Sequence, residues 1–177
     1  VDPLTGAAAP GNPLAGGPIS GDDRIIAHGL RNPYRTAFHP VSGALYVGDV
    51  GSSSREEINR IPATGDGLVE NFGWPCWEGT PPNAGFSGIP LCDDLVAGTG
   101  TWVVATVPTT AFFEYSHQPA LDGCNPAGSS VSALAFESDS NYPIAFDDSL
   151  FFTDYTRRCL FAMKAGPGGD PDPLQVE

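Results

Sequence analysis

Short apolar runs alternate with clusters of Gly, Pro, Asn and Ser along most of this chain. Residues 34–38 and 44–50 are runs of β-branched, aromatic and small apolar side chains, separated by the turn-forming residues 39–43. This pattern predicts a β-hairpin. A third run, at residues 57–61, alternates polar and apolar side chains as a half-buried strand does. The three strands fit most of one propeller blade, a four-stranded sheet that recurs every ~40–50 residues. The same pattern also fits part of a β-sandwich.

Strand-like runs return in the second half of the chain. They lie at residues 107–115, 130–136, 150–154 and 159–163, and they predict a second blade. An internal repeat supports this prediction, because Ala37-Phe38 followed by LYVGD is echoed by Ala135-Phe136 followed by LFFTD. The repeat distance exceeds one blade, and an inserted loop accounts for the excess.

We therefore expect residues 1–177 to be part of a single all-β propeller domain. Within it we expect a loop at 1–23, a first blade core at 24–61, a long loop at 62–106, and a second blade with the start of the next at 107–177. Residues 24–28 predict a strand at the outer edge of a preceding blade. Both chain ends fall beside expected strands and no leader is present, which indicates an internal fragment.

Composition limits the partners of the chain. It has 21 acidic and 8 basic side chains, a formal net charge of −13, which repels phosphate backbones and argues against nucleic acid. No apolar run approaches the ~20 residues that a membrane-spanning helix needs. Two blades cannot close a ring, so we expect the remaining blades of a propeller as partners, or self-association through open blade edges.

The amino-acid sequence of the first blade is more informative than its hydrophobic pattern. Residues 29–33 read GLRNP, residues 45–51 read LYVGDVG, residues 57–59 read EIN and residues 71–75 read NFGWP. These stretches closely resemble the glucose/sorbosone dehydrogenase family, the soluble sugar dehydrogenases that use pyrroloquinoline quinone. Residues 128–155 resemble a later blade of the same family. The resemblance implies a six-bladed β-propeller, of which about two blades are present here.

The resemblance implies two alternative functions. The first is a secreted quinoprotein that oxidises an aldose or polyol sugar substrate with pyrroloquinoline quinone. The second is a non-catalytic propeller that binds carbohydrate or protein and has lost the cofactor. Under the first hypothesis we expect these residues alone to be inactive, because the family's His base belongs to a blade that precedes the residues present.

Cofactor-binding candidates come from the same resemblance. Arg31 and Asn32 match positions that contact the quinone, and a guanidinium fork beside an amide suits a planar polyanion. The alternative is a turn at Asn32-Pro33, with Arg31 paired to a carboxylate. Tyr34 stands where the best-characterised members carry Gln.

Main-chain carbonyls of Gly51 and Ser52 match the positions that bind calcium in the family, and hard cations take oxygen ligands. The family members with the clearest site carry Pro at the position of Ser52. An ordinary Ser-rich turn is the alternative for residues 49–54.

A second cofactor-facing group is expected at the turn after residue 154. The family's Lys position falls on Thr156, and Arg157 and Arg158 follow it, so Arg157 is a further candidate. Asn125-Pro126 stands where the family has a Trp that stacks on the quinone.

Other candidate groups favour structural roles. We expect His28, His39 and His117 to be surface residues, and Glu56-Glu57 to be a solvated strand edge. The sequence contains no Gly-rich phosphate loop and no Gly-x-Ser-x-Gly elbow.

The four cysteines form an even set without metal-ligand spacing, which indicates disulfides and an oxidising compartment. We expect a secreted or extracellular protein, with the periplasm as a further option. Of the three possible pairings, proximity along the predicted blades favours Cys76–Cys92 and Cys124–Cys159.

Overall fold

A computed structural model describes residues 2–9, 11–17, 22–62, 67–99, 108–118, 124, 128–137 and 142–177. Most of the regular structure is β. The strands are β1 Ala27–His28, β2 Pro33–Phe38, β3 Leu45–Asp49, β4 Arg55–Ile61, β5 Glu70–Asn71, β6 Phe113–Ser116, β7 Val131–Phe136, β8 Leu150–Asp154, β9 Cys159–Ala165 and β10 Pro171–Val176. The helical elements are η1 Asp22–Arg24, η2 Ala84–Phe86, α1 Pro90–Ala97 and η3 Ile144–Phe146.

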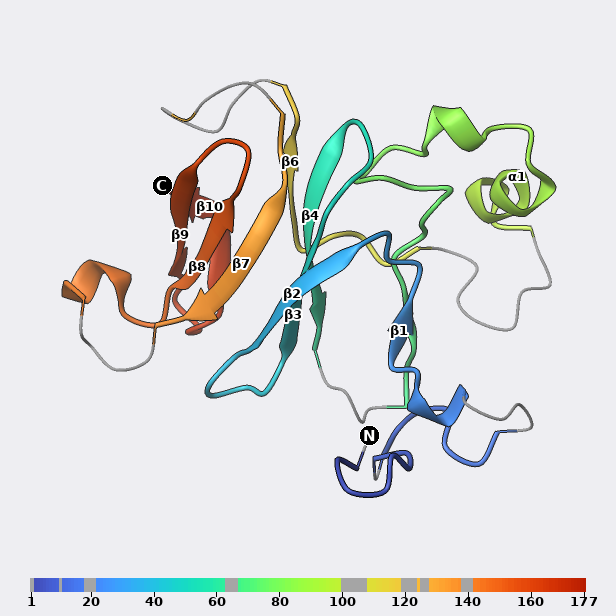
Figure 1. Cartoon of the computed structure of the whole chain (residues 1–177), viewed down its shortest axis with the longest axis horizontal. Helices are drawn as coiled ribbons and strands as arrows, with labels where there is room; N and C mark the ends of the chain where they lie inside the picture. Colours follow the sequence, from blue (N-terminus) through green and yellow to red (C-terminus); the bar gives the residue numbers. More distant parts are fainter. Residues whose placement is uncertain are drawn as a thin grey trace.

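Two four-stranded antiparallel sheets lie side by side (Figure 1). The first has the order β2-β3-β4-β6, and the second has the order β7-β8-β9-β10. The all-β prediction is therefore confirmed. In each sheet the first strand lies at one edge and the chain then moves outward strand by strand, which is the arrangement within a propeller blade.

The fourth strand of each sheet differs from the sequence prediction. The strand around Phe113 was expected in the second blade, but β6 pairs with β4 and completes the first sheet. The second sheet is completed by β10, which occupies residues where only the start of a further strand was expected. The long insertion thus separates the third and fourth strands of one sheet. Hydrophobic pattern alone cannot assign a strand across such an insertion, because the pattern is the same in either sheet.

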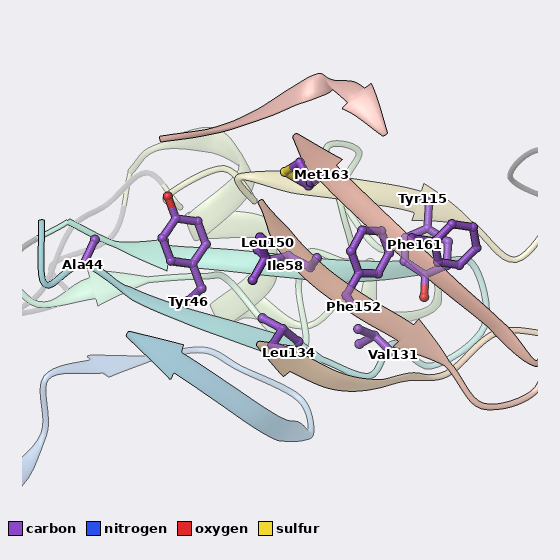
Figure 2. Close-up of a cluster of buried hydrophobic side chains, with 10 residues drawn as sticks. All are labelled: Ala44, Tyr46, Ile58, Tyr115, Val131, Leu134, Leu150, Phe152, Phe161 and Met163. Carbon is purple, nitrogen blue, oxygen red and sulfur yellow. The ribbon is translucent and has the colours of Figure 1, made fainter. Parts of the chain in front are cut away.

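The main core fills the interface between the two sheets (Figure 2). Its buried members come from both sheets and are Ala44, Tyr46, Ile58, Tyr115, Val131, Leu134, Leu150, Phe152, Phe161 and Met163. Phe152 and Phe161 stack with ring centres 5.0 Å apart. Alternation along β3, β8 and β9 directs these side chains to one face, as the period of two predicts. In β7 a register shift between Val131 and Ala133 brings Val131 and Leu134, three residues apart, into the same core.

The opposite face of the first sheet is also buried. Leu45, Val47, Ile61 and Phe72 pack there with partly buried residues of β1 and the segment after it. β1 pairs in parallel with β5, so residues 27–28 and 70–71 form a short second layer beside the sheet. The expected strand at residues 24–28 is thus shorter than predicted.

Two disulfides join distant parts of the chain, in the pairing that the sequence favoured. Cys76–Cys92 joins two parts of the long insertion, the segment after β5 and α1, and Cys124–Cys159 links the segment before β7 to the start of β9. Both cysteines of the first bridge are buried with Leu95 in a small separate cluster. Among the described residues, no helix has the length and apolar character that crossing a bilayer requires.

Replacing Phe152 by Ala should lower the free energy of unfolding by about 3–5 kcal/mol, because its ring is 0% exposed and the sheets cannot close the resulting cavity. Phe38→Ala is the matched control, since Phe38 is 62% exposed and its loss should change stability by about 0.5 kcal/mol at most. Urea denaturation of both variants checks this. Equal losses would mean that the inter-sheet core is not where stability resides.

Candidate functional site

The segments that carry the predicted site residues lie at one end of the two sheets. β2 begins opposite the end of β3, with Pro33 paired to Asp49, and β7 begins opposite the end of β8 in the same way. The two ends are joined, because Val131 N donates to Glu56 Oε2 at 2.9 Å across the interface. We call this the loop end; its segments are residues 29–32, 50–54 and 155–158.

Asp49 fixes the backbone that leads into β2. Its two carboxylate oxygens accept hydrogen bonds from Arg31 N at 2.9 Å and Asn32 N at 2.6 Å. Burial raises the pKa of Asp49, while these two N–H donors and the Arg31 charge lower it in part. The carboxylate therefore holds the backbone of residues 31–32, the two predicted cofactor residues, in one conformation.

The Arg31 guanidinium spans the loop after β3. Its Nη1 donates to the carbonyl oxygens of Val50 at 3.0 Å and Gly51 at 2.8 Å, and its central carbon lies 5.4 Å from the ring centre of Trp74. Among the described residues, the guanidinium thus contacts carbonyl oxygens and an aromatic ring and forms no ion pair with a carboxylate. The Arg31 side chain remains exposed, which leaves it free to meet a ligand.

Asn32 and Tyr34 are also exposed at the loop end. The Asn32 carbonyl accepts a hydrogen bond from Val50 N at 3.1 Å, which ties its backbone to the same loop. The Tyr34 ring lies 5.0 Å from the guanidinium carbon of Arg35. The cofactor roles of Arg31, Asn32 and Tyr34 stay predictions, and all three side chains are accessible to a ligand.

Glu78 organises the loop at residues 52–55, and sequence reasoning did not identify it. Its Oε1 accepts backbone hydrogen bonds from Ser52, Ser53, Ser54 and Arg55 at 2.8, 2.8, 2.9 and 3.1 Å. Burial raises the pKa of Glu78, but the four N–H donors outweigh it, so the pKa is lowered. The contact joins positions more than 20 residues apart, and an acidic residue in a Gly-rich loop carries no sequence signal for it.

This arrangement does not fit a calcium ion held through Gly51. The Gly51 carbonyl faces a guanidinium cation, which would repel a metal at the same oxygen. The Glu78 oxygen that touches the loop is already shared by four N–H donors. The described residues also contain no cluster of three or more acidic, His or Cys side chains suited to a metal. The Gly51 and Ser52 assignment stays a prediction without structural support.

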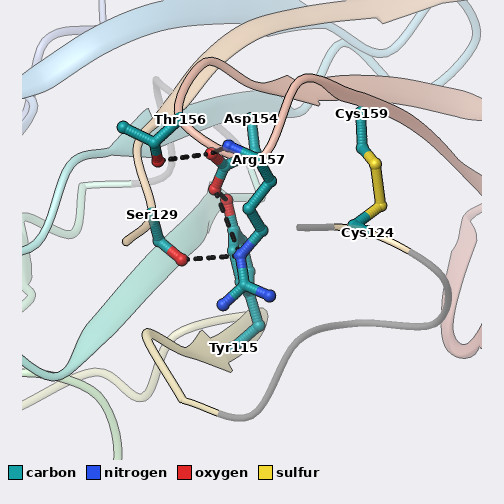
Figure 3. Close-up of a disulfide and its surroundings, with 7 residues drawn as sticks. All are labelled: Tyr115, Cys124, Ser129, Asp154, Thr156, Arg157 and Cys159. Carbon is teal, nitrogen blue, oxygen red and sulfur yellow. Dashed lines mark hydrogen bonds and ion pairs between the residues drawn. A yellow bond between two sulfur atoms is a disulfide. The ribbon is translucent and has the colours of Figure 1, made fainter. Parts of the chain in front are cut away.

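Arg157 lies inside the interface between the sheets (Figure 3). It is 2% exposed, its Nε donates to Ser129 Oγ at 2.8 Å, and its Nη2 donates to the Ser116 carbonyl at 2.6 Å. Its Nε also lies 3.8 Å from Asp154 Oδ2. These contacts hold the two sheets together, so the described geometry gives Arg157 a structural role and leaves its cofactor role a prediction.

Both neighbours of Arg157 are exposed. Thr156 Oγ1 donates to Asp154 Oδ1 at 2.9 Å, so the position of the family's Lys is tied to the same aspartate. Arg158 is exposed and adopts a left-handed backbone with φ 58°. Arg158 is therefore the accessible arginine of this turn. Asn125 lies outside the described residues.

Glu56 and Glu57 are buried on opposite faces of β4, which corrects the expectation of a solvated strand edge. Glu56 is 0% exposed and its Oε1 lies 2.7 Å from His117 Nε2, while Glu57 accepts from Gly79 N and Asn59 Nδ2. Both faces of the first sheet are covered, so side chains on both faces of β4 are buried, with only Arg55 and Arg60 partly exposed. Burial raises the pKa of both carboxyls, against the hydrogen bonds that they accept.

The histidines also differ from the prediction. His39 is buried at the opposite end of the sheets, where its Nδ1 accepts from Val41 N and Ser42 N and its Nε2 lies 3.1 Å from the Gly169 carbonyl. His28 and His117 are partly buried. Burial lowers the pKa of His28. These contacts give His39 and His117 structural partners in place of free surface positions.

Two small pockets are formed by described residues. One of about 100 Å³ lies beside Glu57, lined by Phe72, Trp77 and Thr109 among others. Another of about 110 Å³ lies beside the Cys76–Cys92 bridge. Both fall below the ~300 Å³ at which ligand pockets usually begin, and neither is lined by residues 29–32, 50–54 or 155–158.

The two four-stranded sheets are two blades of a β-propeller, and this is the fold class of the chain. The family model for glucose/sorbosone dehydrogenase matches residues 3–125, and the chain belongs to this family. A curated relative, the aldose sugar dehydrogenase YliI of Escherichia coli (strain K12), is 30% identical over 119 residues, which is 67% of this chain and 26% of that protein.

Solved structures share the fold. The form of the aldose sugar dehydrogenase from Streptomyces coelicolor with bound pyrroloquinoline quinone matches with a TM-score of 0.56 and 19% identity, over 97% of this chain and 35% of that one. A glucose dehydrogenase matches with a TM-score of 0.64 and 23% identity, over 98% of this chain and 41% of that one. The chain thus spans about a quarter to two fifths of these relatives.

Gly51→Ala should destabilise the protein by about 1–3 kcal/mol or more, because a Cβ at Gly51 would lie 1.5 Å from the Arg55 carbonyl oxygen and the loop would have to open. Gly168→Ala is the control, since a Cβ there meets nothing within 4 Å. Thermal or urea unfolding of both variants measures the difference. A Gly51→Ala variant as stable as the control would contradict the loop geometry.

Glu57→Gln should make stability less dependent on pH. The pKa of Glu57 is raised above its ordinary value of 4.5, so the folded state binds the proton more tightly and stability falls as the pH rises through the raised pKa. A neutral amide removes this loss, and Asn59 Oδ1, which has no partner, can accept from it. The variant should match the parent below pH 4.5 and exceed it at pH 8.

Asp172→Asn should change the pH dependence of stability in the opposite direction, measured by the same urea titrations. Hydrogen bonds from Gln175 and Leu174 lower the pKa of Asp172, so its contribution is present at neutral pH and is lost in acid. Its substitution should reduce stability slightly at pH 8 and not below the lowered pKa. Parallel pH profiles for the two variants would contradict the assignment of Glu57 as a carboxyl destabilised by burial.

Proposed function

We propose that this chain contributes one wall of a pyrroloquinoline-quinone site in a sugar dehydrogenase that oxidises an aldose or polyol. The observation that carries the proposal is the Arg31 guanidinium, which is exposed at the loop end and lies over Trp74. A cation with several N–H donors beside an aromatic ring suits a planar ligand that carries carboxylates. The aldose sugar dehydrogenase with bound quinone, which shares the fold, supports the same proposal.

The chain's own residues would bind and orient the ligand. Arg31 would pair with a carboxylate, and the Asn32 amide could both donate and accept next to it. Tyr34 and Arg158, both exposed at the loop end, extend the same surface. When bound, the quinone supplies an acceptor for the hydride that leaves the sugar. Calcium has no place in this proposal, because the Gly51 carbonyl is committed to Arg31.

The proposal includes the rest of a ring. In the described sheets, most side chains along β2 are exposed, and β6 and β10 are edge strands. Further blades would lie beside these two sheets, in one propeller domain that includes residues 1–177. Without them, association of copies through these edges is expected. The two disulfides favour an oxidising location, so we propose a secreted or periplasmic protein.

Arg31→Ala should weaken binding of pyrroloquinoline quinone roughly 10- to 100-fold, since one charge-assisted hydrogen-bonding group is lost. Quenching of tryptophan fluorescence on titration with the quinone measures the dissociation constant. Arg35→Ala is the matched control, because Arg35 is an exposed arginine on β2 whose guanidinium, among the described residues, contacts only Tyr34. It should leave the constant within about twofold.

Dye-linked oxidation of a panel of aldoses separates enzyme from binding module. We expect these 177 residues alone to be inactive and the complete ring to turn over when loaded with quinone. Equal affinities of the parent, Arg31→Ala and Arg35→Ala for the quinone would contradict the assigned site. No quinone binding by the complete ring would overturn the proposed function and favour the non-catalytic alternative.

A further inference from the structure

Four consecutive peptide N–H groups converge on one oxygen at the loop end. Glu78 Oε1 accepts from residues 52, 53, 54 and 55 at distances between 2.8 and 3.1 Å. Glu78 is 4% exposed, so water competes poorly for these donors. Consecutive N–H groups that point to one centre form an anion-binding concavity. Here the anion is a side chain of the protein.

The same loop directs its preceding carbonyls toward Arg31. With the N–H groups of residues 52–55 turned toward Glu78, the carbonyls of Val50 and Gly51 accept from Arg31 Nη1 at 3.0 and 2.8 Å. The loop at residues 50–55 is closely packed, because a Cβ at Gly51 would lie 1.5 Å from the Arg55 carbonyl oxygen and 3.0 Å from Glu78 Oε1. The direction of the Arg31 side chain therefore depends on the shape that Glu78 imposes.

Glu78 is itself held on both sides. Cys76, two residues before it, forms the bridge to Cys92, and Gly79 N, directly after it, donates to Glu57 Oε1. Trp74 N donates to the Gly29 carbonyl at 2.8 Å, which places the Trp74 ring beside Arg31. The long insertion thus contributes two residues to the loop end: Trp74, which contacts the Arg31 guanidinium, and Glu78, which accepts hydrogen bonds from residues 52–55.

We propose that Glu78 is a positioning residue of the cofactor site: it fixes the loop at residues 50–55 and, through the carbonyls of Val50 and Gly51, holds the Arg31 guanidinium in the direction that receives an anionic ligand. The inference rests on the proposed function for the identity of the ligand. It also assigns a purpose to the disulfide-linked insertion, which is to carry Glu78 and Trp74 to the loop end.

Amide hydrogen exchange tests the first half without any ligand. In Glu78→Ala the amides of residues 52–55 should exchange at least about tenfold faster, because the opening of the loop no longer breaks hydrogen bonds to a charged acceptor. Glu78→Gln keeps one acceptor oxygen and should be intermediate, which also covers the case in which the alanine variant does not fold. Asp172→Asn, a charge-matched change on the β9–β10 side, should leave these amides unchanged. Unchanged exchange in both Glu78 variants would overturn the proposal.

A double-mutant cycle tests the second half. Glu78→Gln should weaken binding of pyrroloquinoline quinone roughly tenfold, in the lower range for removal of an outer-shell partner. In the Arg31→Ala background it should have almost no further effect, because Glu78 acts through Arg31. Additive losses would show that Glu78 supports stability only, and they would overturn the positioning role.

The two proposals fail differently. If the parent protein does not bind the quinone, the proposed function fails, and the positioning role is then decided by the exchange data together with the Arg31 Nε–H signal in an NMR spectrum. That signal should move and broaden in Glu78→Gln and stay in place in Asp172→Asn. A signal that is unaffected by Glu78→Gln would overturn the link from Glu78 to Arg31.

Discussion

An aspartate at the end of the second strand determines how each sheet begins. Asp49 accepts from the N–H groups of Arg31 and Asn32, and Asp154 accepts from Ser130 N at 2.9 Å. Both carboxylates are buried, so water cannot replace these N–H donors if they are lost. The segment that enters the first strand is thereby fixed, and with it the backbone of Arg31 and Asn32, two of the candidate ligand groups at the loop end.

The interface between the sheets combines apolar packing with a buried polar network. Packed aromatic rings alone tolerate small relative shifts, whereas directional bonds define one offset. Glu56 reaches across to Val131 N and pairs with His117, while Tyr115 donates to Asp154 Oδ2 at 2.8 Å. Burial is the main cause of the raised pKa of Tyr115, and its bond to the aspartate adds to the effect. The network thus specifies the register of one blade against the next.

The sequence predicted more of the fold than of the site. Strands β2, β3, β4, β7, β8 and β9 follow from short apolar runs between turn residues, and both disulfides follow from proximity along them. The partner of β6 did not follow, because pairing across a long insertion leaves no local trace. Glu56 and Glu57 were expected to be solvated, because alternating polar and apolar residues usually indicate a strand with one solvent-exposed face. Both faces of this blade are covered, so both carboxyls are buried. Glu78 could not be found, since its role depends on a distant backbone.

The insertion between β4 and β6 also bears on how the first sheet assembles. Closing a loop of about 50 residues has an entropic cost that grows only logarithmically, by about 0.6 kcal/mol for each doubling of length. The Cys76–Cys92 bridge has a sequence separation of 16, so it shortens the effective loop by less than half and changes the closure entropy by less than that amount. The bridge therefore does little to help β6 find β4. Its effect is confined to the insertion, where it joins the segment after β5 to α1 and packs against Leu95.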